Sequence, residues 1–286
     1  TRSTLPGPSD LGLTEVTTTP EGFHDTPLVN GVAYPSLSVE PKAYRFRILN
    51  AANDRMWNLG FYVAADATTV DPNDPTANYP QVQLCDGTHS AQANCSEIRT
   101  VPFVGPNTPT STTFTCDATG KTPTSAAYPF AFPCAGGLEG TGWGAQDNRP
   151  GGVPDPSTAG PSMWVIGNEG GLVPAPVEVP STPFNYEYNK RSVTVLNVQE
   201  RGLMLGNAER ADVVVDFSQF AGKTLILYND SAAPVPAGDP RLDYYTGIGD
   251  QTAAGGAPNT LPGYGPNTRT IMQIKVAALP QGATAT

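Results

Sequence analysis

The stretch Ala43-Tyr44-Arg45-Phe46-Arg47-Ile48-Leu49 carries the clearest structural signal in this chain. Its side chains alternate, so that Tyr44, Phe46 and Ile48 would lie on one face of an extended strand and the two arginines on the other. This period of two is typical of a half-buried antiparallel strand. The stretch therefore predicts a β-sheet with one face toward a hydrophobic core.

The rest of the chain repeats this kind of signal, whereas helical periodicity is almost absent. Short strand patterns occur at Trp57 to Val63, Met163 to Ile166, Ser192 to Val198, Ala211 to Phe217, Thr224 to Tyr228 and Thr270 to Val276. Most of them end near Gly, Pro, Asn or Asp, which are turn-forming residues. Repeated short strands predict an all-β sandwich or barrel.

One connection between two of these strands is short enough to predict its geometry. Residues Ala221-Gly222-Lys223 lie between the strand that ends at Phe217 and the strand that starts at Thr224. A short segment with a central glycine is typical of a compact turn. We therefore expect these two strands to pair as a hairpin.

Charge and composition narrow the class of protein. The 286 residues carry 16 basic and 26 acidic side chains, a formal net charge of −10, which disfavours binding to nucleic acid. No window approaches the ~18 uninterrupted apolar residues of a membrane span, and no apolar segment of signal-peptide type follows the first residues. The Pro- and Thr-rich run from Leu5 to Pro20 is typical of an interdomain linker. We expect a soluble piece of a longer polypeptide, without membrane contact.

The composition changes near Ala65 and changes back near Ser162. These 98 residues contain 13 Pro, 11 Gly and all four cysteines, and their 3 basic and 9 acidic side chains give a net charge of −6. A structureless stretch of this length is unusual inside a compact domain, so cross-links would explain how it stays ordered. We expect residues 65–162 to form an inserted subdomain.

The four cysteines, Cys85, Cys95, Cys116 and Cys134, allow three pairings, and the sequence selects none of them rigorously. We favour Cys85–Cys95 and Cys116–Cys134, because both loops are short and each closure would stabilise the segment by roughly 3 kcal/mol. Disulfides persist in oxidising compartments, so this pairing predicts an exported protein that is extracellular or in the cell envelope. The alternative is four free thiols in a cytosolic protein.

Histidine is scarce, which limits the chemistry of the chain. Only His24 and His89 are present, and this excludes histidine-rich metal or general-base chemistry. The tempting cluster of Cys85 and His89, with Cys95 nearby, lacks the second histidine and the methionine that a blue-copper site needs. His24 lies beside Asp25, but no Gly-x-Ser-x-Gly elbow supplies a nucleophile. We predict no catalytic and no metal-binding residue in this chain.

Three further motifs are interpreted as ordinary structure. Asp71 to Pro75 lacks the glycine and the terminal Glu of an EF-hand calcium loop. Gly167 to Gly171 has the wrong spacing for a phosphate-binding loop. The sequons Asn94-Cys95-Ser96 and Asn229-Asp230-Ser231 match the pattern for N-glycosylation, but the pattern is short and often arises by chance. The sequence alone assigns no function to any of them.

A group of charged residues, Glu209, Arg210 and Asp212, lies at the start of the apolar run Val213-Val214-Val215. Ion pairs at the point where a strand enters a core are usually structural, and an arginine that forks between carboxylates is the favourable arrangement. We expect a structural cluster there, without catalytic use.

Several longer blocks resemble the second cupredoxin domain of multicopper oxidases, in the branch of spore-coat laccase, bilirubin oxidase and phenoxazinone synthase. The blocks cover residues 27–64 and 163–277 in the right order: Leu28-Val29-Asn30-Gly31 with Pro35, Val39 to Ala51, Arg55, Asn58-Leu59, Ile166 to Pro174, Ala208 to Phe217, Leu227 to Asp230 and Ile271 to Val276. The resemblance implies an all-β, Greek-key β-sandwich of cupredoxin-like type. Within these blocks Asn30, Gly31 and Arg47 are expected to be structural.

The resemblance also implies a parent enzyme that oxidises phenolic, aromatic-amine or metal-ion substrates at one copper and reduces dioxygen to water at a three-copper cluster. In the family the copper ligands lie in His-x-His and His-Cys-His strings of the outer domains, and no such string occurs here. The chain is therefore expected to be a copper-free middle domain that is inactive alone. Its partners would be the flanking cupredoxin domains of the same polypeptide, and a homo-oligomer could form through the exposed docking faces.

The expected organisation is a linker over residues 1–26, a cupredoxin-like domain over 27–64 and 163–277, the insertion over 65–162 and a C-terminal linker over 278–286. The short relatives have no counterpart of the insertion, whose acidic charge would favour cationic substrates. The alternative from another class is a free-standing extracellular β-sandwich binding module, in which the insertion makes the site. A complete small enzyme is the third reading.

Overall fold

The computed structural model describes residues 26–70, 82–89, 94–101, 153–183, 202–231, 269–279 and 282. Their strands are β1 (Leu28–Val29), β2 (Val32–Ala33), β3 (Ser36–Val39), β4 (Ala43–Leu49), β5 (Trp57–Val70), β6 (Val82–Leu84), β7 (Cys95–Ile98), β8 (Thr100–Val101), β9 (Val153–Pro154), β10 (Met163–Asn168), β11 (Gly171–Val179), β12 (Leu203–Leu205), β13 (Arg210–Asp216), β14 (Thr224–Asn229) and β15 (Thr270–Val276). Two 3-10 turns, η2 (Pro156–Thr158) and η3 (Ser218–Phe220), lie between these strands. Neither has the length or apolar character needed to cross a membrane.

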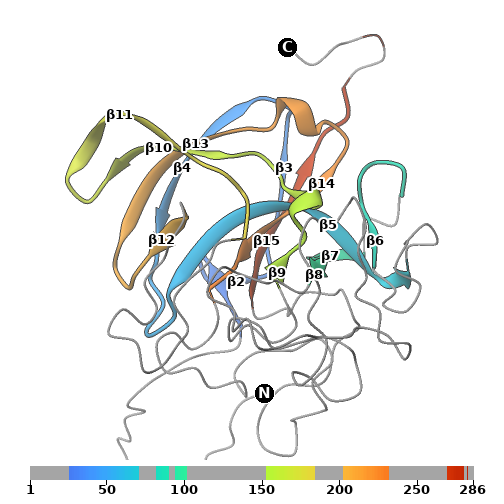
Figure 1. Ribbon diagram of the computed structural model, residues 1–286, viewed down its shortest axis with the longest axis horizontal. Helices are drawn as coiled ribbons and strands as arrows, with labels where there is room; N and C mark the ends of the chain where they lie inside the picture. The colour runs from blue at the N-terminus through green and yellow to red at the C-terminus, as the bar shows by residue number, and fades with distance from the viewer. Residues whose placement is uncertain are drawn as a thin grey trace, which may run out of the picture.

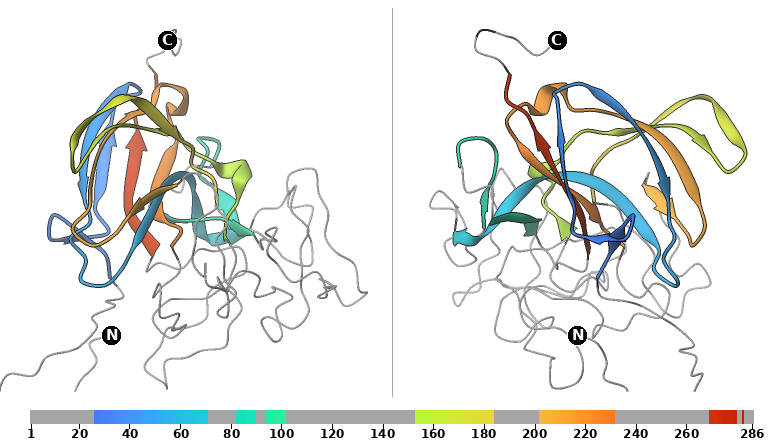
Figure 2. Two further views of the ribbon diagram at one scale, coloured as in Figure 1. Left: turned by 60° about the vertical axis from the view of Figure 1, so that its left-hand side comes forward. Right: turned by 180° about the vertical axis from the view of Figure 1, so that it is seen from behind.

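Two sheets form the body of the fold (Figure 1). The small sheet has the antiparallel order β11-β10-β13-β4, and the large sheet has the order β12-β5-β14-β15-β3. The pairing of β3 with β15 is parallel, and both views in Figure 2 show these two strands side by side. At its far end β5 also pairs with β6 and β7, away from the projecting hairpin of β10 and β11.

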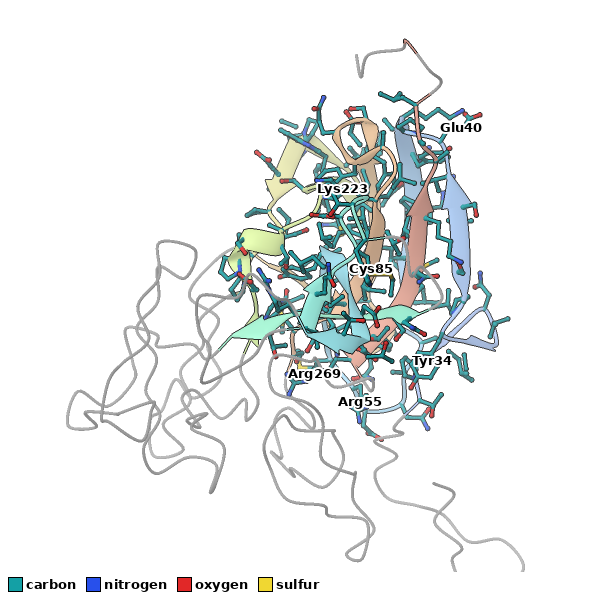
Figure 3. All side chains as sticks on the ribbon, turned by 90° about the vertical axis from the view of Figure 1, so that its right-hand side faces the viewer. Tyr34, Glu40, Arg55, Cys85, Lys223 and Arg269 are labelled. Atoms are coloured by element: carbon teal, nitrogen blue, oxygen red, sulfur yellow. A yellow bond between two sulfur atoms is a disulfide. The ribbon has the colours of Figure 1, made fainter. Side chains whose placement is uncertain are left out.

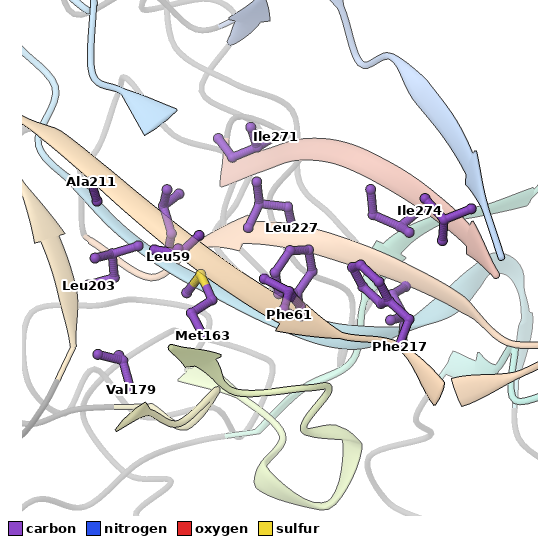
Figure 4. Close-up of a cluster of buried hydrophobic side chains, with 14 of the residues drawn as sticks. Leu59, Phe61, Met163, Val179, Leu203, Ala211, Phe217, Leu227, Ile271 and Ile274 are labelled. Carbon is purple, nitrogen blue, oxygen red and sulfur yellow. The ribbon is translucent and has the colours of Figure 1, made fainter. Parts of the chain in front are cut away.

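The main core lies between the two sheets. Strand β4 shows the predicted alternation, because Tyr44, Phe46 and Ile48 are half-buried while the residues between them are exposed. Phe217 is completely buried, and its ring centroid lies 6.0 Å from that of Tyr44 on the small sheet and 5.6 Å from that of Phe61 on the large sheet. Figure 4 shows Phe61 and Phe217 adjacent in this core. The aromatic contacts therefore link the two layers directly.

A second core covers part of the opposite face of the large sheet, over β5 and β14. Strand β14 is buried along its whole length, with Leu225 and Leu227 in the main core and Ile226 and Tyr228 in the second one. The other members of the second core are Tyr62, Ala64, Cys85, Cys95 and Ile98. Since sheets buried on both faces need continuous apolar strands, this arrangement explains the run Leu225-Ile226-Leu227-Tyr228.

The expected hairpin across Ala221-Gly222-Lys223 is wrong. Gly222 does turn the chain with a positive φ of 77°, but β13 belongs to the small sheet and β14 to the large sheet. The physical reason is burial, because β13 alternates between inner and outer residues whereas β14 is buried on both faces. The connection, which includes η3, therefore crosses from one layer to the other.

The first described part of the expected insertion is hydrogen-bonded to the body. Strand β5 continues to Val70, beyond the predicted end at Val63, and β6 and β7 pair with this extension. The described residues on either side of 102–152 pair with each other, because Thr100 pairs with Pro154 and the Arg99 Nε–H donates to Asp155 Oδ2 at 2.8 Å. We call this paired β8–β9 region the neck. The expected strand from Ser192 to Val198 lies outside the described residues.

The predicted all-β, cupredoxin-like sandwich is confirmed by this architecture. The hairpin of β1 and β2 accounts for two of the residues expected to be structural. Asn30 and Gly31 form its two-residue turn, with φ values of 50° and 84°. Positive φ at both central positions is the requirement that favours Asn-Gly in such turns.

Candidate functional site

The strap is the part of the chain where the sequence concentrates candidate ligands, and we define it as residues 82–89 with 94–98. A disulfide joins its two halves between Cys85 and Cys95, whose Cα atoms lie 6.1 Å apart, so this predicted pair is confirmed. Both cysteines are buried against the large sheet, and Figure 3 shows Cys85 in the middle of the body. Cys116 and Cys134 lie outside the described residues, and their pairing stays a prediction.

His89 of the strap contacts a carboxylate that the sequence analysis did not single out. Its Nε2 lies 2.7 Å from Oδ2 of Asp66, which belongs to the β5 extension and is fully buried. Asp66 also accepts hydrogen bonds from the Thr68 backbone N–H at 2.8 Å, the Thr68 hydroxyl at 2.7 Å and the Thr69 hydroxyl at 3.0 Å. Burial raises the pKa of Asp66, but the hydrogen bonds from His89, Thr68 and Thr69 outweigh it and lower the pKa to about 2.

The strap does not have the donor set of a copper or zinc site. Cys85 and Cys95 are oxidised to a disulfide and so offer no thiolate, and the imidazole of His89 contacts a single carboxylate, that of Asp66. Among the described residues, no group of three or more His, Cys, Asp or Glu side chains could hold a metal ion. The described residues of the strap thus lack the donor set that copper prefers. His24 lies outside the described ranges.

A second polar cluster is buried where β7, β14 and β15 meet. Its members are Glu97, Tyr228, Asp230, Arg269 and Thr270, all at most 4% exposed. The Thr270 hydroxyl donates to Glu97 Oε2, but burial dominates and raises the pKa of Glu97 well above its ordinary value. Burial likewise raises the pKa of Tyr228. The sequence analysis missed this cluster, because its members come from three separated stretches and follow no common spacing.

The charged residues expected to form one cluster on β13 are distributed over separate contacts. Asp212 accepts hydrogen bonds from Nε and Nη2 of Arg45 on β4, and Arg210 pairs with Glu169 in the β10–β11 turn. Glu209 accepts a hydrogen bond from the backbone N–H of Gly206.

Arg47, the remaining residue expected to be structural, stands opposite Asp212 in the register of β4 and β13. Hydrogen bonding from Arg45 and, to a smaller degree, the charge of Arg47 lower the pKa of Asp212. The expected arginine that forks between two carboxylates is not what these residues form: Arg45 from β4 binds the single carboxylate of Asp212 through two of its nitrogens, and Arg210 pairs with Glu169.

The polar clusters thus connect strands to one another. Asp66 and His89 attach the strap to β5, Glu97 and Thr270 attach β7 to β15, and Arg45 attaches β4 to β13. Each contact joins residues at least 23 positions apart in the chain. The arrangement can hold neighbouring strands within each sheet in register.

Sequence comparison finds similarity to multicopper oxidases over a small part of the chain. A laccase of Bacillus stratosphericus is 46% identical over 61 residues, which are 21% of this chain and 12% of the laccase. A multicopper oxidase of Arabidopsis thaliana, LPR1, is 39% identical over 61 residues, 21% of this chain and 10% of that protein. A laccase of Haloferax volcanii is 57% identical over 35 residues, 12% of this chain and 6% of that protein. The matched segments thus span 6% to 12% of these relatives.

No protein-family model matches the chain. Among solved structures, the McoA multicopper oxidase of Aquifex aeolicus is similar at a TM-score of 0.36 and 17% identity, covering 94% of this chain and 29% of that one. Because this TM-score is low, the fold assignment rests on the strand pairing described above. The local sequence matches support a relationship to the multicopper oxidases.

Proposed function

We propose that this chain is a copper-free middle cupredoxin domain of an exported multicopper oxidase. The observation that carries the proposal is the local identity to laccases, 46% over 61 residues in one case. The blocks that resemble the family lie in residues 27–64 and 163–277, on both sides of the expected insertion. The parent enzyme would oxidise phenolic, aromatic-amine or metal-ion substrates and reduce dioxygen to water, with its coppers in the flanking domains.

The role proposed for this domain is to hold the flanking domains in register. A spacer needs rigidity, and the large sheet has it because cores cover both of its faces over β5 and β14. A spacer also needs surfaces that accept its neighbours. Leu49, Trp164 and Leu172 are exposed on or beside the small sheet, at 54%, 41% and 79%. Exposed large apolar side chains of this kind suit a domain interface.

We further propose that the acidic insertion shapes access for the reducing substrate. The neck is the supporting observation, since it pairs the residues before 102 with those after 152. A net charge of −6 over residues 65–162 would raise the local concentration of cations. In the full-length enzyme, the combined substitutions Asp71→Asn, Asp74→Asn and Asp86→Asn, which halve this charge, should therefore raise KM for Mn²⁺ and cationic dyes more than KM for a neutral phenol. Unchanged kinetics for all three would refute this part.

Export is supported by the disulfide between Cys85 and Cys95, because such bonds persist in oxidising compartments. Thiol alkylation of the protein in its native host compartment tests this point. Two protected cysteines at positions 85 and 95 are expected there, whereas alkylation of both without reductant would contradict export.

The test of the central proposal is the copper-to-protein ratio after incubation with excess copper and exhaustive desalting. We expect a ratio near zero by elemental mass spectrometry, together with His-x-His pairs in the polypeptide that flanks this chain. A retained, stoichiometric copper would overturn the copper-free assignment, and His89→Ala would then be the first variant to measure. Flanking sequence without histidine pairs would instead favour the free-standing binding module.

A further inference from the structure

The chain contains two sequons for N-linked glycosylation, and the structure places them in very different surroundings. The first is Asn94-Cys95-Ser96 at the start of β7, and the second is Asn229-Asp230-Ser231 at the end of β14. A sequon matters only where its asparagine can carry a bulky, solvated group at the protein surface. Burial and hydrogen bonding of the two asparagines therefore distinguish them.

The side chain of Asn229 lies in the interior of the protein. Its side chain is 2% exposed, and its Oδ1 accepts hydrogen bonds from the Asn58 backbone N–H at 2.8 Å and the Ser231 backbone N–H at 3.0 Å. Its Nδ2 donates to the Met56 carbonyl at 3.2 Å. A sugar on Nδ2 would have to occupy the packed junction of β14 with the start of β5. The folded chain has no room for a glycan there.

Asn94 has the opposite surroundings. It is exposed, and its Nδ2 donates a hydrogen bond to the exposed Thr68 hydroxyl of the β5 extension at 3.2 Å. Ser96, the hydroxyl residue of the sequon, is also exposed and donates to the Asn94 carbonyl at 3.4 Å. Only Cys95 between them is buried, through its disulfide to Cys85. The side chains of Asn94 and Ser96 are thus both exposed, on either side of Cys95, whose disulfide attaches the strand to Cys85.

We propose that Asn94 is an N-linked glycosylation site and that Asn229 is not. In the modification, Asn94 Nδ2 bonds to C1 of the first sugar of a lipid-pyrophosphate-linked oligosaccharide. The bond from C1 to the phosphate oxygen breaks, the lipid pyrophosphate leaves with the electron pair, and the amide nitrogen loses one proton. The glycan would cover the strap beside the disulfide. This inference does not depend on the proposed function.

The test is expression of the full chain with a secretion signal in yeast, followed by peptide mapping of secreted and cell-retained protein before and after endoglycosidase. We expect one glycan per chain, on Asn94. Ser96→Ala should abolish it, Ser96→Thr should keep it, and the matched variant Ser231→Ala should leave it unchanged. Asn94→Gln provides an independent loss of the acceptor.

Two results would overturn the inference. One is a chain with the disulfide between Cys85 and Cys95 intact that carries no glycan on Asn94 in either fraction. The other is a folded, secreted chain that carries a glycan on Asn229. If Ser96→Ala fails to fold, the presence or absence of a glycan on Asn94 of the unaltered chain still tests the inference.

Discussion

Two buried carboxylates, Asp66 and Glu97, show how neighbouring donors decide the ionisation of an acid. Asp66 receives hydrogen bonds from His89, Thr68 and Thr69, and these overcome the cost of burial. Glu97 receives one from Thr270, and burial dominates. The same type of group is therefore charged at neutral pH in one place and favours the neutral form in the other.

The first prediction concerns Asp66. Because its pKa falls to about 2 in the folded chain from an ordinary value of 3.8, the folded state binds fewer protons than the unfolded state between these values. The charged form then contributes up to ~2 kcal/mol, fully present above about pH 4 and lost as the pH falls toward 2. Asp66→Asn should lower the free energy of unfolding at pH 7 by about this amount, measured by urea denaturation.

A matched control is Asp86→Asn, which changes an exposed carboxylate that accepts from the Thr88 backbone N–H at 3.0 Å. It should have a much smaller effect at every pH. Equal losses for the two variants, or a pH-independent loss for Asp66→Asn, would contradict the account of the buried contact with His89.

The second prediction concerns Glu97 and has the opposite sign. Its pKa is raised well above 4.5, so in the folded state it keeps a proton that the unfolded state releases as the pH rises through 4.5. Stability is therefore lost as the pH rises above that value. Glu97→Gln removes the titrating group but keeps the shape, and it should raise Tm at pH 7 to 8 and leave it unchanged near pH 4.

Glu178→Gln on the exposed strand β11 is the corresponding control, and its Tm should differ little from that of the unaltered chain at either pH. Thermal denaturation followed by circular dichroism at pH 4, 6 and 8 measures both variants. A Glu97→Gln variant that is less stable than the unaltered chain at pH 8 would show that the buried carboxylate is charged and paired.

At the scale of elements, the segment that leads into β10 is held against β5 by a close backbone contact. The Gly160 N–H donates to the Phe61 carbonyl at 2.7 Å, and a Cβ on residue 160 would lie 2.8 Å from that oxygen and 2.9 Å from its carbon. Both atoms belong to the backbone of a buried strand, which cannot move easily. The segment therefore needs glycine at this position.

Gly160→Ala should consequently destabilise the fold by about 1–3 kcal/mol, the usual cost of overpacking. Gly170→Ala is the control, because the nearest atom to a Cβ there is Asn168 Oδ1 at 3.6 Å. Chemical denaturation of both variants measures the difference. A loss for Gly170→Ala as large as that for Gly160→Ala would contradict the steric explanation.

The elements also show which parts of the fold the sequence predicts. Strand β4 was predictable, because its alternation reflects one buried and one exposed face. The partner strands of β14 were not predictable. A continuous apolar run indicates that both faces of a strand are buried, but it does not indicate which strands lie beside it. Strands β6 to β9 have two to four residues each, which is too short to show the alternation of apolar and polar residues that marks a strand. Their positions depend on pairing with distant residues.

The candidate site was predictable only where its residues are close in sequence. The disulfide between Cys85 and Cys95 joins residues 10 positions apart, and loop length favoured it. The contact between Asp66 and His89 spans 23 positions and that between Glu97 and Thr270 spans 173. No local pattern marks such pairs, because they meet only after the sheets have packed.

For the whole molecule, the two cores predict an uneven distribution of stability. Amides of Leu225 to Tyr228 lie in the strand with both faces buried, and their exchange should require global unfolding. Amides of the outer strand β11, which is mostly exposed, should exchange much faster. Hydrogen–deuterium exchange with mass spectrometry measures both segments in one experiment. Similar protection in the two strands would contradict the picture of a central strand covered on both sides.

The parallel pairing of β3 with β15 has a consequence for biosynthesis. Ser36 pairs with Gln273, so 237 residues separate the two partners along the chain. At about 5–20 residues per second, a ribosome adds those residues in roughly 10 to 50 seconds. Throughout that interval the nascent chain holds β3 without its partner, and Leu37 and Val39 are open to other hydrophobic surfaces. A chaperone that binds this early segment would therefore have its longest opportunity during translation, before the last strand closes the sheet.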